Sequence, residues 1–131
     1  GVALSDELGL TAQPMDTIQR RDDEQFLRDL TVLLTGISPD LFVVGLPLRL
    51  DGSEGGAARR ARKLSSLLET SFEVPVELWD ERMTSIQAER VLIDAGVSRK
   101  GRRGPTDRMA AAIILQSFLD AHRDELRERF Q

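Results

Sequence analysis

The segment Leu41–Leu46 reads Leu-Phe-Val-Val-Gly-Leu, a continuous apolar run of strand length. A strand that faces water on one side alternates apolar and polar residues, whereas an unbroken apolar run suits a strand buried on both faces. Strands of that kind occur in parallel sheets that carry helices on each side. The run therefore predicts an α/β protein whose sheet is covered by helices.

A second strand of this sheet is predicted within Val74–Arg82, where apolar residues alternate before the segment ends abruptly in Asp-Glu-Arg. Thr84 and Gln87 can then form a capping box, which predicts that a helix starts directly afterwards. Open α/β folds place their ligands where the carboxyl end of a strand turns into a helix. The turn after this strand is therefore the candidate functional site.

The other predicted elements surround these two strands. Further strands are expected over residues 1–5 and 10–20, and Pro14 should confine the latter to an edge or a bulge. Helices are expected over about 22–35, 57–70, 85–95 and from Pro105 onward. The charged end from His122 to Gln131 is expected to fray, with His122 exposed. Strands that alternate with helices imply parallel pairing through right-handed crossovers.

Length and composition set broad limits on the function. The chain has 131 residues, which fits a single domain over residues 1–131 with one core. It has no cysteine, so a disulfide framework and a thiolate metal site are excluded. Its net charge of −4 argues against indiscriminate nucleic-acid binding. Without a bilayer-length apolar segment or a secretory leader, we expect a cytoplasmic protein that does not contact membranes.

Three carboxylates are the candidate catalytic groups: Asp80 and Glu81 at the turn, and Asp107 in the first turn of the last helix. Ionised carboxylates without His or Cys nearby suit a hard cation such as Mg²⁺. Metal ions of this kind can hold the attacking and leaving oxygens of a phosphodiester. The same residues would also fit a plain helix cap and a solvated turn with a surface ion pair, so both interpretations stay open.

A basic loop precedes Asp107 and carries four positive charges, at Arg99, Lys100, Arg102 and Arg103. Such side chains, together with Arg82 at the turn, can hold phosphate oxygens of a nucleic acid. No aromatic residues lie between these charges, so stacking on bases is not indicated. A solvated loop that serves solubility is the alternative.

Several stretches resemble, in order and at the expected spacing, the signature of the YqgF family, also called RuvX. They are Val2–Asp6, Leu8–Pro14, Val43–Pro47 with Asp51–Gly55, Asp80–Ser85 with Ala88–Arg90, Gly96–Lys100, and Asp107 with Ala111–Gln116. The resemblance covers nearly the whole chain. It implies an RNase H-like fold, with a mixed central sheet flanked by helices on both faces.

The resemblance also implies a bacterial, cytoplasmic nuclease that uses Mg²⁺ or Mn²⁺. The family is associated with maturation of the 5′ end of the 16S rRNA precursor and was earlier proposed to resolve Holliday junctions, which are branched DNA. Its catalytic carboxylates correspond to Glu81 and Asp107 here, and Asp80 would orient Arg82 or support the metal ligands. The family's first strand, with its catalytic aspartate, would precede Gly1, so we expect an interruption near the middle of the sheet.

Three functions follow from these features. The first is a metal-dependent endonuclease acting on pre-16S rRNA or on branched DNA. The second is a non-catalytic RNA-binding module, whose binding would survive chelation and weaken with salt. The third is a structural or partner-binding domain, in which an exposed sheet edge would pair with another chain, for example in a homodimer.

Overall fold

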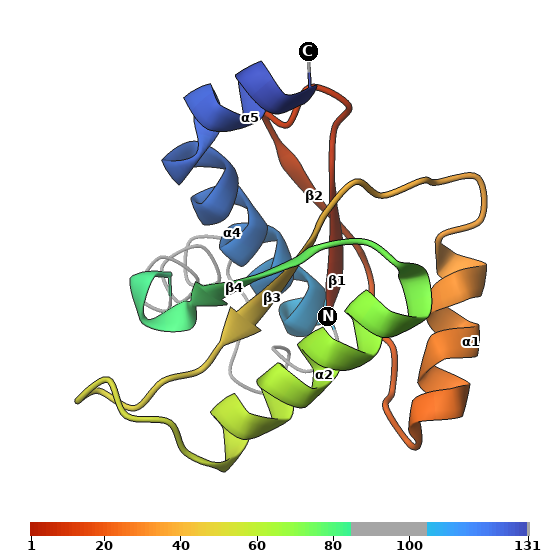
Figure 1. Ribbon diagram of the computed structural model, residues 1–131, viewed down its shortest axis with the longest axis vertical. Helices are drawn as coiled ribbons and strands as arrows, with labels where there is room; N and C mark the ends of the chain where they lie inside the picture. Colours follow the sequence, from red (N-terminus) through yellow and green to blue (C-terminus); the bar gives the residue numbers. More distant parts are fainter. Residues whose placement is uncertain (85–104, 131) are drawn as a thin grey trace.

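The computed structural model describes residues 1–84 and 105–130 of the chain. The elements follow one another along the chain as shown in Figure 1. They are β1 (Val2–Ser5), β2 (Ala12–Asp16), α1 (Asp23–Leu33), β3 (Phe42–Leu46), α2 (Gly56–Phe72), β4 (Val76–Asp80), the short 3₁₀ turn η1 (Glu81–Met83), α4 (Pro105–Ala121) and α5 (Arg123–Phe130). The helix predicted over residues 85–95 lies outside the described residues.

The predicted buried strand, β3, pairs in parallel with β4, and the register joins Val44 to Leu78 and Leu46 to Asp80. Helix α2 connects the two strands and packs on them, as a parallel crossover requires. Val44 and Leu46 are buried against α1 and α2, whereas Val43 packs against α4. The alternation of side chains along β3 therefore explains why its sequence is apolar at every position: both faces are covered.

The strands β1 and β2 form an antiparallel pair whose register shifts between Val2 and Ala3, opposite the segment that contains Pro14. In this pair β2 has no second neighbour among the described residues, so Pro14 lies in an edge strand beside an irregularity, as predicted. Gln116 of α4 fixes the start of β2: its side chain accepts a hydrogen bond from the Ala12 amide (2.9 Å) and donates one to the Leu10 carbonyl (2.9 Å).

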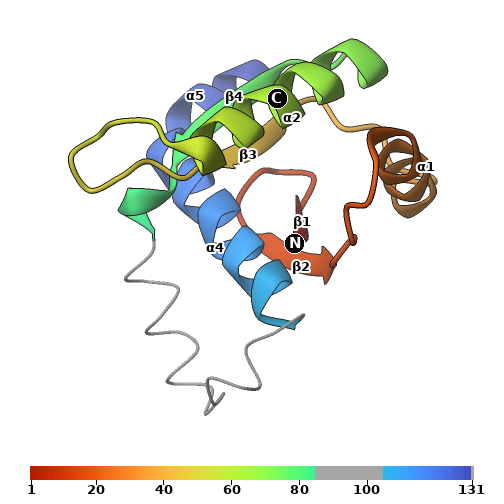
Figure 2. The same ribbon diagram turned by 90° about the horizontal axis from the view of Figure 1, so that it is seen from below.

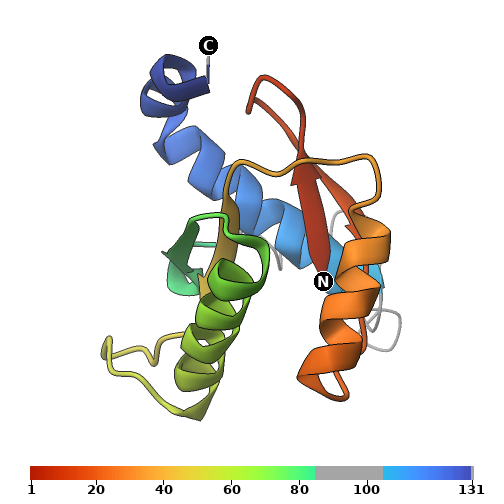
Figure 3. The same cartoon turned by 45° about the vertical axis from the view of Figure 1, so that its right-hand side comes forward.

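The predicted mixed α/β class is confirmed, and the described strands form two sheets of two strands each. Figure 2 shows the β1–β2 pair beside α4, apart from β3 and β4. Figure 3 shows α2 in front of β3 and β4, with α4 passing behind them. Among the described residues, no ladder hydrogen bond joins the β1–β2 pair to the β3–β4 pair.

Helix α4 contributes to both halves of the molecule. Its residues Phe118 and Leu119 are buried against Val43 and Trp79, while Ala110–Leu115 are half-buried. A helix that contacts two sheets needs apolar side chains around much of its circumference, which explains its composition. Even so, no helix in the described ranges combines the length and hydropathy that a bilayer crossing demands.

The C-terminal segment differs from its prediction. Residues predicted to fray form the helix α5. His122 is half-buried rather than exposed, because its ring stacks on Phe118 with centroids 4.3 Å apart and meets Trp79 edge-on at 5.4 Å. The prediction of an exposed His122 was wrong. The neighbouring residues in the sequence are charged and gave no sign that the His122 ring packs against Phe118 and Trp79.

Candidate functional site

The candidate site begins where β4 ends. Because β3 and β4 are parallel, both present their carboxyl ends at one edge of the sheet, with Leu46 opposite Asp80. Asp80 starts the turn η1 by accepting a hydrogen bond from the Arg82 amide at 2.9 Å. Because Asp80 caps the turn, Glu81 lies at the edge of the sheet where α/β folds bind their ligands.

The Glu81 side chain lies directly over Gly45 of the neighbouring strand. A Cβ atom built at Gly45 would collide with the Glu81 carboxyl group and would lie 2.9 Å from its Cγ and Cδ atoms. Glycine is therefore the residue that leaves room for this carboxyl at the sheet surface. Sequence analysis did not identify Gly45 as part of the site, although a glycine within an otherwise apolar strand is a known sign of close approach.

Burial raises the pKa of the Glu81 carboxyl, and the negative charge of Asp80 adds to the rise. Glu81 forms no hydrogen bond or ion pair through its carboxyl group within residues 1–84 and 105–130. A half-buried carboxylate without a positive partner is costly, and a cation beside it would offset that cost. The raised pKa of Glu81 and its lack of a cationic partner are therefore compatible with a cation-binding role.

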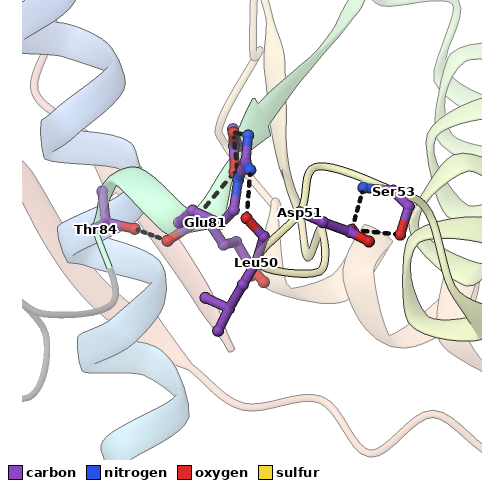
Figure 4. A network of polar contacts seen from close by, with 7 residues as sticks. Leu50, Asp51, Ser53, Glu81 and Thr84 are labelled. Carbon is purple, nitrogen blue, oxygen red and sulfur yellow. Dashed lines mark hydrogen bonds and ion pairs between the residues drawn. The ribbon is translucent and has the colours of Figure 1, made fainter.

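The backbone of Glu81 is held by Thr84. The Thr84 amide and its hydroxyl both donate to the Glu81 carbonyl, at 3.0 and 3.2 Å. Thr84 is almost completely buried, with 1% of its surface exposed. These two hydrogen bonds hold the backbone of the turn in place, and Figure 4 shows the contact between Thr84 and Glu81.

Asp80 and Arg82 form an ion pair within the turn. Arg82 donates through Nη2 to Asp80 at 2.7 Å and through Nε to both carboxylate oxygens, at 3.1 and 3.0 Å. These hydrogen bonds lower the pKa of the Asp80 carboxyl. The geometry matches two of the roles considered for Asp80, orienting Arg82 and forming a surface ion pair. The contact of Arg82 with nucleic acid stays a prediction. In the structure the Arg82 guanidinium is already bound to Asp80.

Arg82 also ties the loop after β3 to this turn. Its Nη1 donates to the Leu50 carbonyl at 3.4 Å, and its charge contributes to a lowered pKa of Asp51, whose main cause is the Ser53 hydrogen bonds. Figure 4 shows Leu50, Asp51 and Ser53 beside Glu81. Contacts between segments 32 residues apart carry no local sequence signal, so this connection was not predicted.

Asp107 lies on a different element from the other two carboxylates. It occupies the first turn of α4 with an exposed side chain, and the backbone of Gly1 packs closely against its carbonyl. Among the described residues it forms no hydrogen bond or ion pair with Asp80 or Glu81, and no three acidic or His side chains are grouped for metal binding. The convergence of Glu81 and Asp107 on one cation stays a prediction.

The predicted basic loop precedes Asp107 in the sequence. Its four charged residues lie outside the residues that the structure describes: Arg99, Lys100, Arg102 and Arg103. Their predicted contacts with phosphate therefore stay a prediction as well.

Comparison with known proteins places the chain in a family. The model of the family described as "RuvX: Holliday junction resolvase" matches residues 1–121. The chain belongs to the RuvX family. The resemblance found in its motifs is thereby confirmed, and its mixed α/β architecture is that of the RNase H-like fold.

Relatives of this RuvX protein are similar over most of both chains. A protein of Symbiobacterium thermophilum is 48% identical over 121 residues, covering 92% of this chain and 84% of its own. One from Pelotomaculum thermopropionicum is 46% identical over 129 residues, covering 98% and 84%. A third, from Halothermothrix orenii, is 44% identical over 120 residues, covering 92% and 86%. Each of these three relatives is named "Putative pre-16S rRNA nuclease".

Proposed function

We propose that this chain is a metal-dependent endonuclease that hydrolyses phosphodiester bonds during 5′-end maturation of pre-16S rRNA in the cytoplasm. The observation that carries the proposal is the Glu81 carboxyl, half-buried over Gly45 with its pKa raised and without a cationic partner in the described residues. The names of the relatives support the choice of substrate.

The donor set fits Mg²⁺ or Mn²⁺, because carboxylate oxygens are the ligands that such hard cations prefer. Glu81 and Asp107 would hold the ion, with Asp80 kept ionised by Arg82 close by. When bound, the metal would supply positive charge to the phosphate and acidify a water molecule. In the overall hydrolysis the water oxygen bonds to phosphorus, the bond from phosphorus to the 3′ oxygen breaks, and a 3′-hydroxyl is released.

The chain's own residues have distinct tasks in this reaction. Glu81 must be ionised to act, so its raised pKa sets the lower pH limit of activity. Thr84 and Gly45 fix the position of Glu81. Arg82 pairs with Asp80, so that Asp80 does not compete with Glu81 for the metal ion. Loss of such a supporting partner commonly costs about 10- to 100-fold in activity or metal affinity.

Cleavage of a pre-16S rRNA fragment with Mg²⁺ or Mn²⁺ tests this proposal. Glu81→Gln should reduce cleavage at least about 100-fold, as expected when a charge that acts in the transition state is removed. Glu77→Gln is the matched control, because Glu77 is exposed on the same strand, and it should cut at the wild-type rate. Equal cleavage by wild type and Glu81→Gln would refute the assignment.

A second candidate substrate is favoured by the family description, which names Holliday junction resolvase. The same variants should therefore be assayed on a four-way DNA junction. Faster cleavage of the junction than of the rRNA fragment would favour resolution of branched DNA. Binding of RNA that survives EDTA without any cleavage, in wild type and Glu81→Gln alike, would favour a non-catalytic RNA-binding module.

A further inference from the structure

Positive charge gathers where the loop after β3 meets the start of α2. A Cβ atom built at Gly55 would lie 3.1 Å from both Nε and Nη2 of Arg49, so this guanidinium covers Gly55. At Gly56 the same construction lies 3.3 Å from Nη1 of Arg60 and 3.9 Å from Nη2 of Arg59. Three guanidinium groups thus surround two consecutive glycines, and we call Arg49, Arg59 and Arg60 the α2 arginine cluster.

The α2 arginine cluster is only weakly neutralised. The guanidinium groups of Arg49 and Arg60 form no hydrogen bond or ion pair in the described part of the chain, and the first turn of α2 contains no acidic residue. Glu54 is close enough to Arg59 for Arg59 to lower its pKa, but its carboxylate oxygens are bound by Arg62, at 2.5 and 3.0 Å. The cluster therefore keeps donors and charge available for a negatively charged ligand.

The part of the cluster that contains Arg49 is held close to the candidate catalytic turn. The loop that carries Arg49 leaves β3 at the edge where Glu81 lies, and the bond from Arg82 to the Leu50 carbonyl attaches it to that turn. Within the loop, the Arg49 amide donates to the Ser53 carbonyl at 3.0 Å, which directs the chain back toward α2. Figure 4 shows the loop passing beside Glu81.

We propose that Arg49, Arg59 and Arg60 bind backbone phosphates of the RNA that is cut at Glu81. This inference rests on the proposed function and adds a substrate-binding surface to it. Guanidinium groups match phosphate oxygens through paired hydrogen bonds, and no aromatic residue occurs between Arg49 and Lys63 to stack on bases. The surface should therefore hold the RNA by its backbone and without sequence preference.

Salt-dependent binding tests this surface separately from cleavage. Affinity for a labelled pre-16S rRNA fragment is measured in EDTA across a salt series, for wild type and for the double variant R49Q/R60Q. The variant should bind about tenfold more weakly, and its slope of log K against log salt should be shallower by about 1.4, the value for two lost phosphate contacts on a single strand. The control R28Q/K63Q also removes two positive charges, from exposed positions on α1 and α2, and should keep the wild-type slope.

Gly55→Ala provides a second variant that leaves the charge unchanged. The added methyl group requires the Arg49 guanidinium to shift by a few tenths of an ångström, so binding should weaken by up to about threefold while thermal unfolding stays cooperative. Wild-type slope and affinity in R49Q/R60Q, together with normal cleavage by wild type, would overturn this inference alone. Unchanged binding by Gly55→Ala would contradict the placement of Arg49. Absence of both binding and cleavage in wild type would overturn the proposed function with it.

Discussion

The two sheets of this protein are stabilised in different ways. The pair β3–β4 is enclosed by α1 and α2 on one face and by α4 on the other, and its core contains six buried apolar side chains. These are Leu30, Val44, Leu46, Ala58, Ala61 and Leu68. The pair β1–β2 packs on α4, and every residue of β1 is only half-buried. Most of the hydrophobic stabilisation therefore lies in the half that carries Glu81.

This difference has a functional consequence. A carboxyl group that is partly desolvated and lacks a positive partner destabilises its surroundings, so it requires a rigid support. The enclosed sheet provides that support through Gly45 and Thr84. Asp107 projects instead from the exposed start of α4, on the less enclosed half. The two predicted metal ligands therefore differ in how deeply they are buried.

The largest expected effect compares one leucine from each half. Leu68→Ala empties a fully packed position, since Leu68 is 5% exposed, and should lower the free energy of unfolding by about 3 kcal/mol. Leu4→Ala in β1 removes a half-buried side chain and should cost about 1 kcal/mol. Urea unfolding of both variants measures the contrast. Equal losses would show that the two halves are equally well packed.

A smaller effect is expected at the contact between β3 and the catalytic turn. Gly45→Ala forces a methyl group into the Glu81 carboxyl and should lower the free energy of unfolding by about 2 kcal/mol. The double variant G45A/E81A removes the clash, so it should recover about 1 kcal/mol relative to the sum of the single changes. Strict additivity in this cycle, measured by urea unfolding, would disprove the contact.

The smallest effect concerns the pH dependence of stability. Because the pKa of Glu81 is raised in the folded state, the folded chain binds more protons than the unfolded chain between the ordinary and the raised pKa. The free energy of unfolding should therefore fall as pH rises through this window. Without metal at neutral pH, the free energy of unfolding of Glu81→Gln should be about 0.5 kcal/mol higher than that of wild type. This value is small because the Glu81 side chain is partly exposed to solvent.

Unfolding in EDTA, at neutral pH and again below the ordinary carboxyl pKa, measures this difference. At the lower pH Glu81 is protonated in both states, so the two proteins should be equally stable. Adding Mg²⁺ at neutral pH should stabilise wild type more than Glu81→Gln. A less stable Glu81→Gln in metal-free neutral buffer would contradict the raised pKa.

Sequence patterns predicted the parts of this fold that depend on local chemistry. The apolar run at Leu41–Leu46 predicted a strand covered on both faces, and Pro14 predicted an edge strand with an irregularity. Either Asp22 or Asp23 can cap the helix predicted over about 22–35, and Asp22 accepts a hydrogen bond from the Gln25 amide at 2.8 Å. Each of these features is determined within a few residues, which is why the sequence alone sufficed.

Features that join distant segments were not predictable in the same way. The approach of Glu81 to Gly45 depends on the register between two strands, and the link from Arg82 to Leu50 depends on the path of a loop. The contacts of His122 with Phe118 and Trp79 depend on how α4 lies against β4. Hydrophobic periodicity predicts which face of an element is buried, but it does not specify which residue of another element it meets.

The position of Trp79 has a practical consequence. It is the only tryptophan of the chain, it lies two residues before Glu81, and its indole donates to Ser117 while packing edge-on against Phe118. Its fluorescence emission therefore reports on the seam between β4 and α4 without any engineered label. Ligand titrations and stopped-flow mixing can use this intrinsic fluorescence to follow ligand binding close to the Glu81 carboxylate.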